Sequence, residues 1–167
     1  MVMLSTAILI FPLLMIVAAC MDLFTMRIYN SISIALAVLF LPLALVGGMS
    51  LVEIGLHYSC GFFALCITFA LFAFGKIGGG DAKLIASSSV WIGWDVLLDY
   101  FYVATLIGGL LALLILAARK VPLPLFLLRI QWIARLHEPK GQIPYGVALG
   151  IGGMLVYPQK RSIFCRR

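Results

Sequence analysis

Two aspartates, Asp22 and Asp81, are the side chains of this 167-residue chain best suited to chemistry. If the fold brings their carboxyl groups within hydrogen-bonding distance, they share a proton, since two like charges side by side resist joint ionisation. One member then stays an acid while the other is a base, which is the arrangement that activates water against a peptide bond. Each residue also has a simpler interpretation: Asp81 as the N-cap of a following helix, and Asp22 as a helix-end residue paired with Arg27.

Three glycines stand directly before Asp81. Residues 76–86 read KIGGGDAKLIA, and the glycines are Gly78, Gly79 and Gly80. Because glycine has no side chain, it permits unusual backbone dihedrals and close approach of another chain. An extended peptide could lie against such a loop and bond to its backbone, as proteolysis requires. Irregular backbone at membrane depth is tolerated only where it lines protein or a wet cavity.

The composition indicates that lipid is the solvent for most of the chain. Hydrophobic residues make up 64% of it and charged residues 11%, whereas soluble domains have about half and a quarter. The net charge of +6 is scattered, which suits anionic lipid headgroups and predicts no nucleic-acid partner. We expect no metal site, because no C-x-x-C pair occurs among Cys20, Cys60, Cys66 and Cys165. We expect no disulfide framework either, because the first three of these cysteines lie in apolar runs.

Six stretches are apolar enough to predict membrane helices, given that ~20 apolar residues cross a bilayer. We therefore expect an all-α, polytopic membrane protein of about six transmembrane helices, forming a single domain over residues 1–167. The first stretch is interpreted as a retained helix, because it lacks the basic start and the cleavage site of a signal peptide. The stretches cover about 4–21, 31–48, 56–75, 82–94, 98–118 and 143–157, with a kink expected at Pro42.

The basic residues of the loops predict the orientation of these helices. If the N-terminus lies outside, the inside segments 22–30, 76–83 and 119–142 hold eight Lys and Arg residues. The outside loops 49–55 and 95–97 then hold none, as the positive-inside rule requires. The basic C-terminal tail would lie outside and disagrees with this pattern. The orientation puts Asp22 and Asp81 together on the cytoplasmic side.

The long inside segment, 119–142, contains an amphipathic stretch. Between residues 126 and 136, apolar side chains are interspersed with Arg129 and Arg135, and Trp132 suits an interface. This pattern is typical of a helix lying in the headgroup layer. A surface anchor is one interpretation, and a lid or substrate-guiding element is the other.

Three stretches carry a family resemblance: DLFTMRIYN at 22–30, GGGDAKLIA at 78–86 and IPYGVALGIGG at 143–153. They resemble motifs of the type IV prepilin peptidases, a GxGD family of membrane aspartyl proteases. The likeness is closer to the short CpaA/TadV branch, which serves Flp or Tad pili. The first two stretches are similar to the two catalytic motifs, although Tyr29 stands where the family usually has proline. The third is similar to a segment of the last helix and covers Pro144, Tyr145 and Gly146.

The resemblance implies that Asp22 and Asp81 are the catalytic pair, without deciding which is acid and which is base. It implies that the substrate is a prepilin or pseudopilin, cleaved after its basic leader at the cytoplasmic face of the bacterial inner membrane. No cofactor is implied. Peptidase activity without N-methylation is expected, because the cysteine-paired domain of longer members is absent from this sequence. We interpret Lys83 as a contact for lipid phosphate or substrate, beside the glycine loop.

Two alternatives from other functional classes remain open. A small ion-coupled or proton-coupled transporter would use intramembrane acids to bind cations or relay protons, and it should carry those acids near mid-membrane. A non-catalytic scaffold of a pilus or secretion machine should hold the two aspartates far apart.

Overall fold

The computed structural model describes residues 2–124, 129–138 and 141–164, and within these ranges it contains helices and no strand. The predicted all-α class is therefore confirmed for the described residues. The helices are α1 (Val2–Thr25), α2 (Asn30–Val46), α3 (Leu51–Ala73), α4 (Gly79–Ile92), α5 (Leu97–Ala118), α7 (Gln131–His137) and α8 (Tyr145–Phe164), with the short 3-10 helix η1 (Trp94–Val96) before α5.

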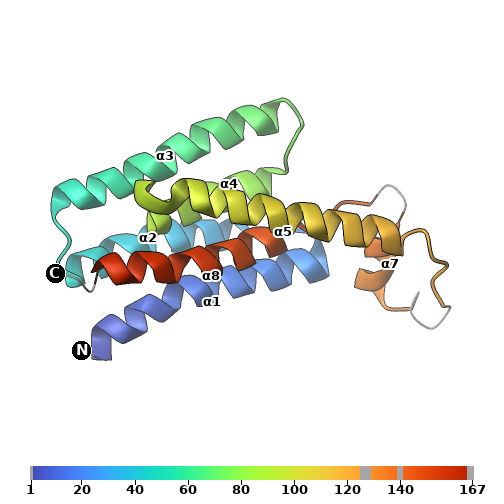
Figure 1. Cartoon of the computed structure of the whole chain (residues 1–167), viewed down its shortest axis with the longest axis horizontal. Coiled ribbons are helices and arrows are strands. Elements are labelled where there is room, and N and C mark those ends of the chain that lie inside the picture. Colours follow the sequence, from blue (N-terminus) through green and yellow to red (C-terminus); the bar gives the residue numbers. More distant parts are fainter. Residues whose placement is uncertain (1, 125–128, 139–140, 165–167) are drawn as a thin grey trace.

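The long helices lie side by side along the longest axis of the molecule, and α7 sits at one end of the bundle (Figure 1). Successive long helices (α1, α2, α3, α4, α5 and α8) run in alternating directions, so α1 begins and α8 ends at the end of the bundle away from α7. The end of α1, the start of α4 and the start of α8 therefore share the α7 end. Three segments that are distant in the sequence meet there.

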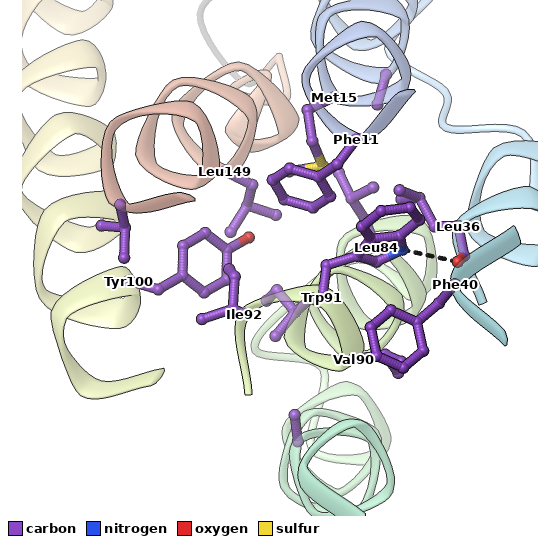
Figure 2. Packing of buried hydrophobic residues seen from close by; sticks show 14 of the residues in the cluster. Phe11, Met15, Leu36, Phe40, Leu84, Val90, Trp91, Ile92, Tyr100 and Leu149 are labelled. Atoms are coloured by element: carbon purple, nitrogen blue, oxygen red, sulfur yellow. Dashed lines mark hydrogen bonds between the residues drawn. The ribbon is translucent and has the colours of Figure 1, made fainter. Parts of the chain in front are cut away.

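Helix α4 lies at the centre of the packing, against α2, α3 and α8. Its residues from Leu84 to Ile92 are all buried, including three consecutive serines whose hydroxyls bond back to carbonyls of the same helix. The Trp91 indole N–H donates to the carbonyl of Leu36 at 2.7 Å, which ties α4 to α2 (Figure 2). The surrounding apolar side chains include Phe11, Met15, Phe40, Val90, Tyr100 and Leu149.

Two of the described helices are long and apolar enough to cross a membrane by length and composition: Leu51–Ala73 and Trp94–Ala118. Three further apolar helical segments are shorter, namely Leu9–Thr25, Asn30–Val46 and Tyr145–Pro158. Helix α4 rises only ~21 Å at ~1.5 Å per residue, which is less than the ~30 Å hydrocarbon core of a bilayer. Two of the six predicted spans thus correspond to helices long and apolar enough to cross a membrane, and the six-span topology stays a prediction.

Several predicted boundaries differ from the observed ones. Helix α1 continues to Thr25 instead of ending near residue 21, so Asp22 lies within its last turn. Helix α4 begins at Gly79, three residues earlier than predicted, and its N-cap is Gly78. The alternative that Asp81 is the N-cap is therefore wrong. Hydrogen bonding explains the shift, because the N–H of Ala82 already donates to the carbonyl of Gly78.

The predicted amphipathic helix is observed in part. The structure describes a helix only from Gln131 to His137, and residues 126–128 of the predicted stretch lie outside the described residues. Trp132 packs edge-on against Phe24 of α1, with ring centroids 5.5 Å apart. The aromatic side chain that we expected at the lipid interface thus also docks α7 onto the bundle.

Candidate active site

Asp22 and Asp81 line the same pocket, which has a volume of about 800 Å³ and lies at the α7 end of the bundle. Its walls come from three parts of the chain: the connection between α1 and α2 with the end of α1, the glycine segment with the start of α4, and the entry into α8. Besides the two aspartates, the lining residues are 26–30, 76–80, Ile85, Gln142, Ile143 and Tyr145.

The Asp22 side chain is 6% exposed and is held by the start of α8. The backbone N–H of Gly146 donates to Asp22 Oδ2 at 2.6 Å. The first N–H groups of a helix have no partner within the helix, and the positive end of the helix dipole lies there. The α1 carboxylate therefore caps a helix that begins more than a hundred residues later.

Asp81 is the third residue of α4 and is held by the start of its own helix. The backbone N–H of Gly78, the N-cap residue, hydrogen-bonds the Asp81 carboxylate, as the third residue does in a capping box. Asp81 precedes the buried apolar stretch of α4 and lies outside the apolar spans named above. Burial, and then the neighbouring Asp22 carboxylate, raise the pKa of Asp81 to about 6, although the Gly78 bond opposes this rise.

The two carboxyl groups can therefore differ in protonation at neutral or mildly acidic pH. Helix N-termini stabilise negative charge on both residues, while burial and mutual repulsion favour keeping one proton. A pair with one proton offers a base for a water molecule and an acid for a carbonyl or leaving amine. The pair titrates as a unit, so a pH profile reports the pair and not one residue.

The three glycines permit close packing and do not adopt unusual dihedrals. Gly78 has φ −72°, and the other two lie in the first turn of α4. A Cβ on Gly79 would lie 3.2 Å from the Phe72 ring, and one on Gly80 would lie 3.3 Å from Ile28 Cβ. The dihedral part of our expectation is wrong, because the left-handed residue of this connection is Gly75, at φ +67°. Gly80 thus lets the start of α4 pack against the loop after α1, and Gly79 lets it pack against α3.

Lys83 is exposed and does not belong to the pocket lining. Its ammonium donates to Asn30 Oδ1 at 3.0 Å, which joins α4 to the first residue of α2. Asn30 lines the pocket, so Lys83 contacts a pocket-lining residue without lining the pocket itself. A contact of Lys83 with lipid phosphate or substrate stays a prediction.

Sequence reasoning assigned no role to Gly146, the donor to Asp22. The signal was present, because Gly146 belongs to the IPYG stretch that resembles a family segment. Its partner could not be read from the sequence, since no spacing rule links α8 to α1. Met26 was also missed: it lines the pocket with φ +54°, a conformation that is uncommon for residues other than glycine.

Residues 9–113 match the sequence model of the type IV leader peptidase family, so the match covers more than half of the chain. The chain belongs to this leader peptidase family. The match includes both aspartates and the glycine segment, while α7 and α8 lie beyond it. No curated protein and no solved structure matches the chain. Membership in the leader peptidase family supports a protease, consistent with a site built from two carboxyl groups.

Raising the pH through about 6 is expected to slow peptide cleavage by this pair. Because burial and the neighbouring Asp22 raise the pKa of Asp81 to about 6, the pair keeps one proton below that pH and loses it above. With both groups ionised, no proton remains for the leaving group. Initial cleavage rates between pH 5 and about 8 in proteoliposomes test this, with far-UV circular dichroism as the folding control. A rate that rises or stays constant above pH 6 would contradict the expectation.

Proposed function

We propose that this protein is a prepilin leader peptidase, an aspartyl endopeptidase that cleaves type IV or Flp-type prepilins at the cytoplasmic boundary of the inner membrane. The observation that carries the proposal is that Asp22 and Asp81 line one pocket, each bonded to a backbone N–H at a helix start. Family membership supports the leader peptide as substrate.

In the proposed mechanism, the substrate enters the pocket as an extended strand beside the glycine segment. The ionised member of the Asp22–Asp81 pair removes a proton from a water molecule, and the water oxygen attacks the scissile carbonyl carbon. The protonated member donates its proton as the carbon–nitrogen bond breaks and the amine leaves. Either aspartate can begin as the base, because both carboxylates face the same pocket.

The proposed membrane placement follows from charge and hydropathy. The basic segments 22–30, 76–83 and 119–142 are assigned to the cytoplasm, and a multi-pass arrangement of about six spans follows from the apolar stretches. Many large apolar side chains on α3 and α5 are exposed, among them Phe62, Phe69, Leu106 and Leu113. Exposing such side chains to lipid carries no hydrophobic penalty, whereas exposing them to water does.

The two other functional classes are less well supported. A transporter should hold its acids near mid-membrane, whereas Asp22 and Asp81 lie in the last turn of α1 and the first turn of α4. A scaffold should hold the two aspartates apart, whereas they line one pocket and the charge of Asp22 acts on Asp81. Both observations favour peptidase chemistry.

Co-expression with candidate prepilins tests the proposal. We expect the prepilin band to shift to the mobility of the mature pilin when the wild-type protein is present, because removal of the leader shortens the chain. The matched control is the double variant D22N/D81N at equal abundance in the membrane. A panel of type IV and Flp-type prepilins that all keep their leaders would contradict the proposal.

A further inference from the structure

We propose that Arg119 is a positioning residue of the active site, acting through the chain segment that delivers the Gly146 N–H to Asp22. Arg119 follows the last residue of α5 and lies outside both the pocket lining and the family match. This inference rests on the proposed peptidase function, since its effect is measured on cleavage.

The Arg119 guanidinium donates hydrogen bonds to three backbone carbonyls in two segments of the chain. Its Nε donates to the Leu136 carbonyl of α7 at 2.7 Å. Its Nη2 donates to the Gly141 carbonyl at 3.0 Å and to the Gln142 carbonyl at 3.3 Å. The planar, always charged guanidinium presents five donors, so one side chain can serve acceptors that lie in different directions. Arg119 therefore fastens the end of α5 to α7 and to the chain entering α8.

The absence of a side chain at Gly141 leaves room for this contact. Its N–H donates to the Glu138 carbonyl at 2.9 Å. A Cβ on Gly141 would lie 2.8 Å from the Arg135 carbonyl oxygen and 3.2 Å from Arg119 Nη2. A clash with a backbone oxygen is not relieved by a side-chain rotation. A side chain at position 141 would thus displace the segment that Arg119 holds.

The segment held by Arg119 forms the third wall of the catalytic pocket. Gln142, the last carbonyl that Arg119 binds, lines the pocket together with Ile143 and Tyr145. Pro144 between them is fully buried, and Gly146 follows with its N–H on Asp22. Only three residues lie between Gln142, which Arg119 binds, and Gly146, which binds Asp22, so added mobility at Gln142 is transmitted to the Gly146 N–H. Arg119 accordingly fixes where the Asp22 carboxyl group lies.

We test the inference with R119A, R119K and the neighbouring control K120A, which removes an exposed cation from the same connection. R119A is expected to lower kcat by about 100-fold, the loss that a 1 Å misplacement of reacting groups produces. R119K should show a similar loss, because an ammonium is a compact donor that cannot span the three carbonyls. K120A should cleave at the wild-type rate.

Three further measurements distinguish a positioning role of Arg119 from a general loss of stability. Guanidinium chloride, added below its denaturing concentration, should restore part of the R119A activity, whereas sodium chloride should not. R119A should also speed hydrogen exchange of peptides covering residues 141–150 while leaving those of α3 unchanged. In the double variant R119A/G141A, the loss should not exceed that of the worse single variant, because both changes disrupt one contact.

The possible results distinguish failure of the Arg119 inference from failure of the proposed peptidase function. Wild-type kcat in a well-inserted R119A would overturn the inference and leave the peptidase proposal standing. Loss of activity without guanidinium rescue, or with faster exchange throughout the bundle, would also overturn it, because Arg119 would then serve global stability. If the wild-type protein cleaves no prepilin, the proposed function fails. The contact of Arg119 with the segment entering α8 can still be tested in that case, because unchanged hydrogen exchange at residues 141–150 in R119A would refute it.

Discussion

The variants D22N and D81N are each expected to reduce prepilin cleavage to the background level, a loss of about 1,000-fold or more. General acid–base catalysis contributes about 10²–10⁴-fold, and each variant removes one half of a pair that works only as a pair. Asparagine keeps the shape of aspartate but neither gives nor takes a proton near neutral pH. The two variants should fail equally, because groups that act as a unit show non-additive losses.

Stability measurements distinguish lost chemistry from lost folding in these variants. Burial and the neighbouring Asp22 charge raise the pKa of Asp81, so an ionised Asp81 costs folding energy above pH 6. Removing that charge in D81N should leave the melting temperature at pH 8 unchanged or higher. The matched control is D95N, an exposed aspartate in η1, at the opposite end of the bundle. Normal cleavage by either D22N or D81N, in a well-inserted protein, would refute the catalytic pair.

The variant G146A is expected to lower kcat by about 100-fold, as a 1 Å misplacement does, while the protein still folds. A Cβ on Gly146 would lie 2.8 Å from Asp22 Oδ2 and 2.9 Å from Ile28 Cδ1. The Ile28 methyl can rotate away, but the carboxylate cannot move without stretching its 2.6 Å bond to the Gly146 N–H. Alanine is compatible with the helical backbone of α8, so we expect G146A to disturb the position of the Asp22 carboxylate and not the helix.

The matched control for G146A is G109A, a change of the same kind in α5. No atom lies within 4 Å of a Cβ built on Gly109. Replacing a helical glycine with alanine removes unfolded-state freedom, so G109A should gain about 0.5–1 kcal/mol and keep full activity. Cleavage rates and melting temperatures of both variants, measured in the same detergent, complete the comparison. A G146A protein with wild-type kcat would show that the Asp22 position tolerates a shift.

The sequence predicted those parts of the fold that depend on local pattern. Apolar runs predicted helices, and all six expected stretches overlap observed ones. Boundaries were less accurate where backbone hydrogen bonds extend a helix past the apolar run, as at Thr25 and Gly79. The expected dihedral freedom of the three glycines was wrong, because close contacts with Phe72 and Ile28 explain Gly79 and Gly80 instead.

By itself, the sequence determined the helical class, singled out Asp22 and Asp81 as candidates for chemistry, and predicted that they share one end of the bundle. These follow from composition, from the rarity of acids in an apolar chain and from the alternation of loops, all of which are local or additive properties. Only the tertiary structure decided what holds each carboxyl group: Gly146 of α8 for Asp22, and Gly78 for Asp81. The tertiary structure also showed that Arg119 hydrogen-bonds the Gly141 and Gln142 carbonyls, in the segment that enters α8. Contacts between distant segments depend on how whole helices pack, and no spacing along the chain encodes them.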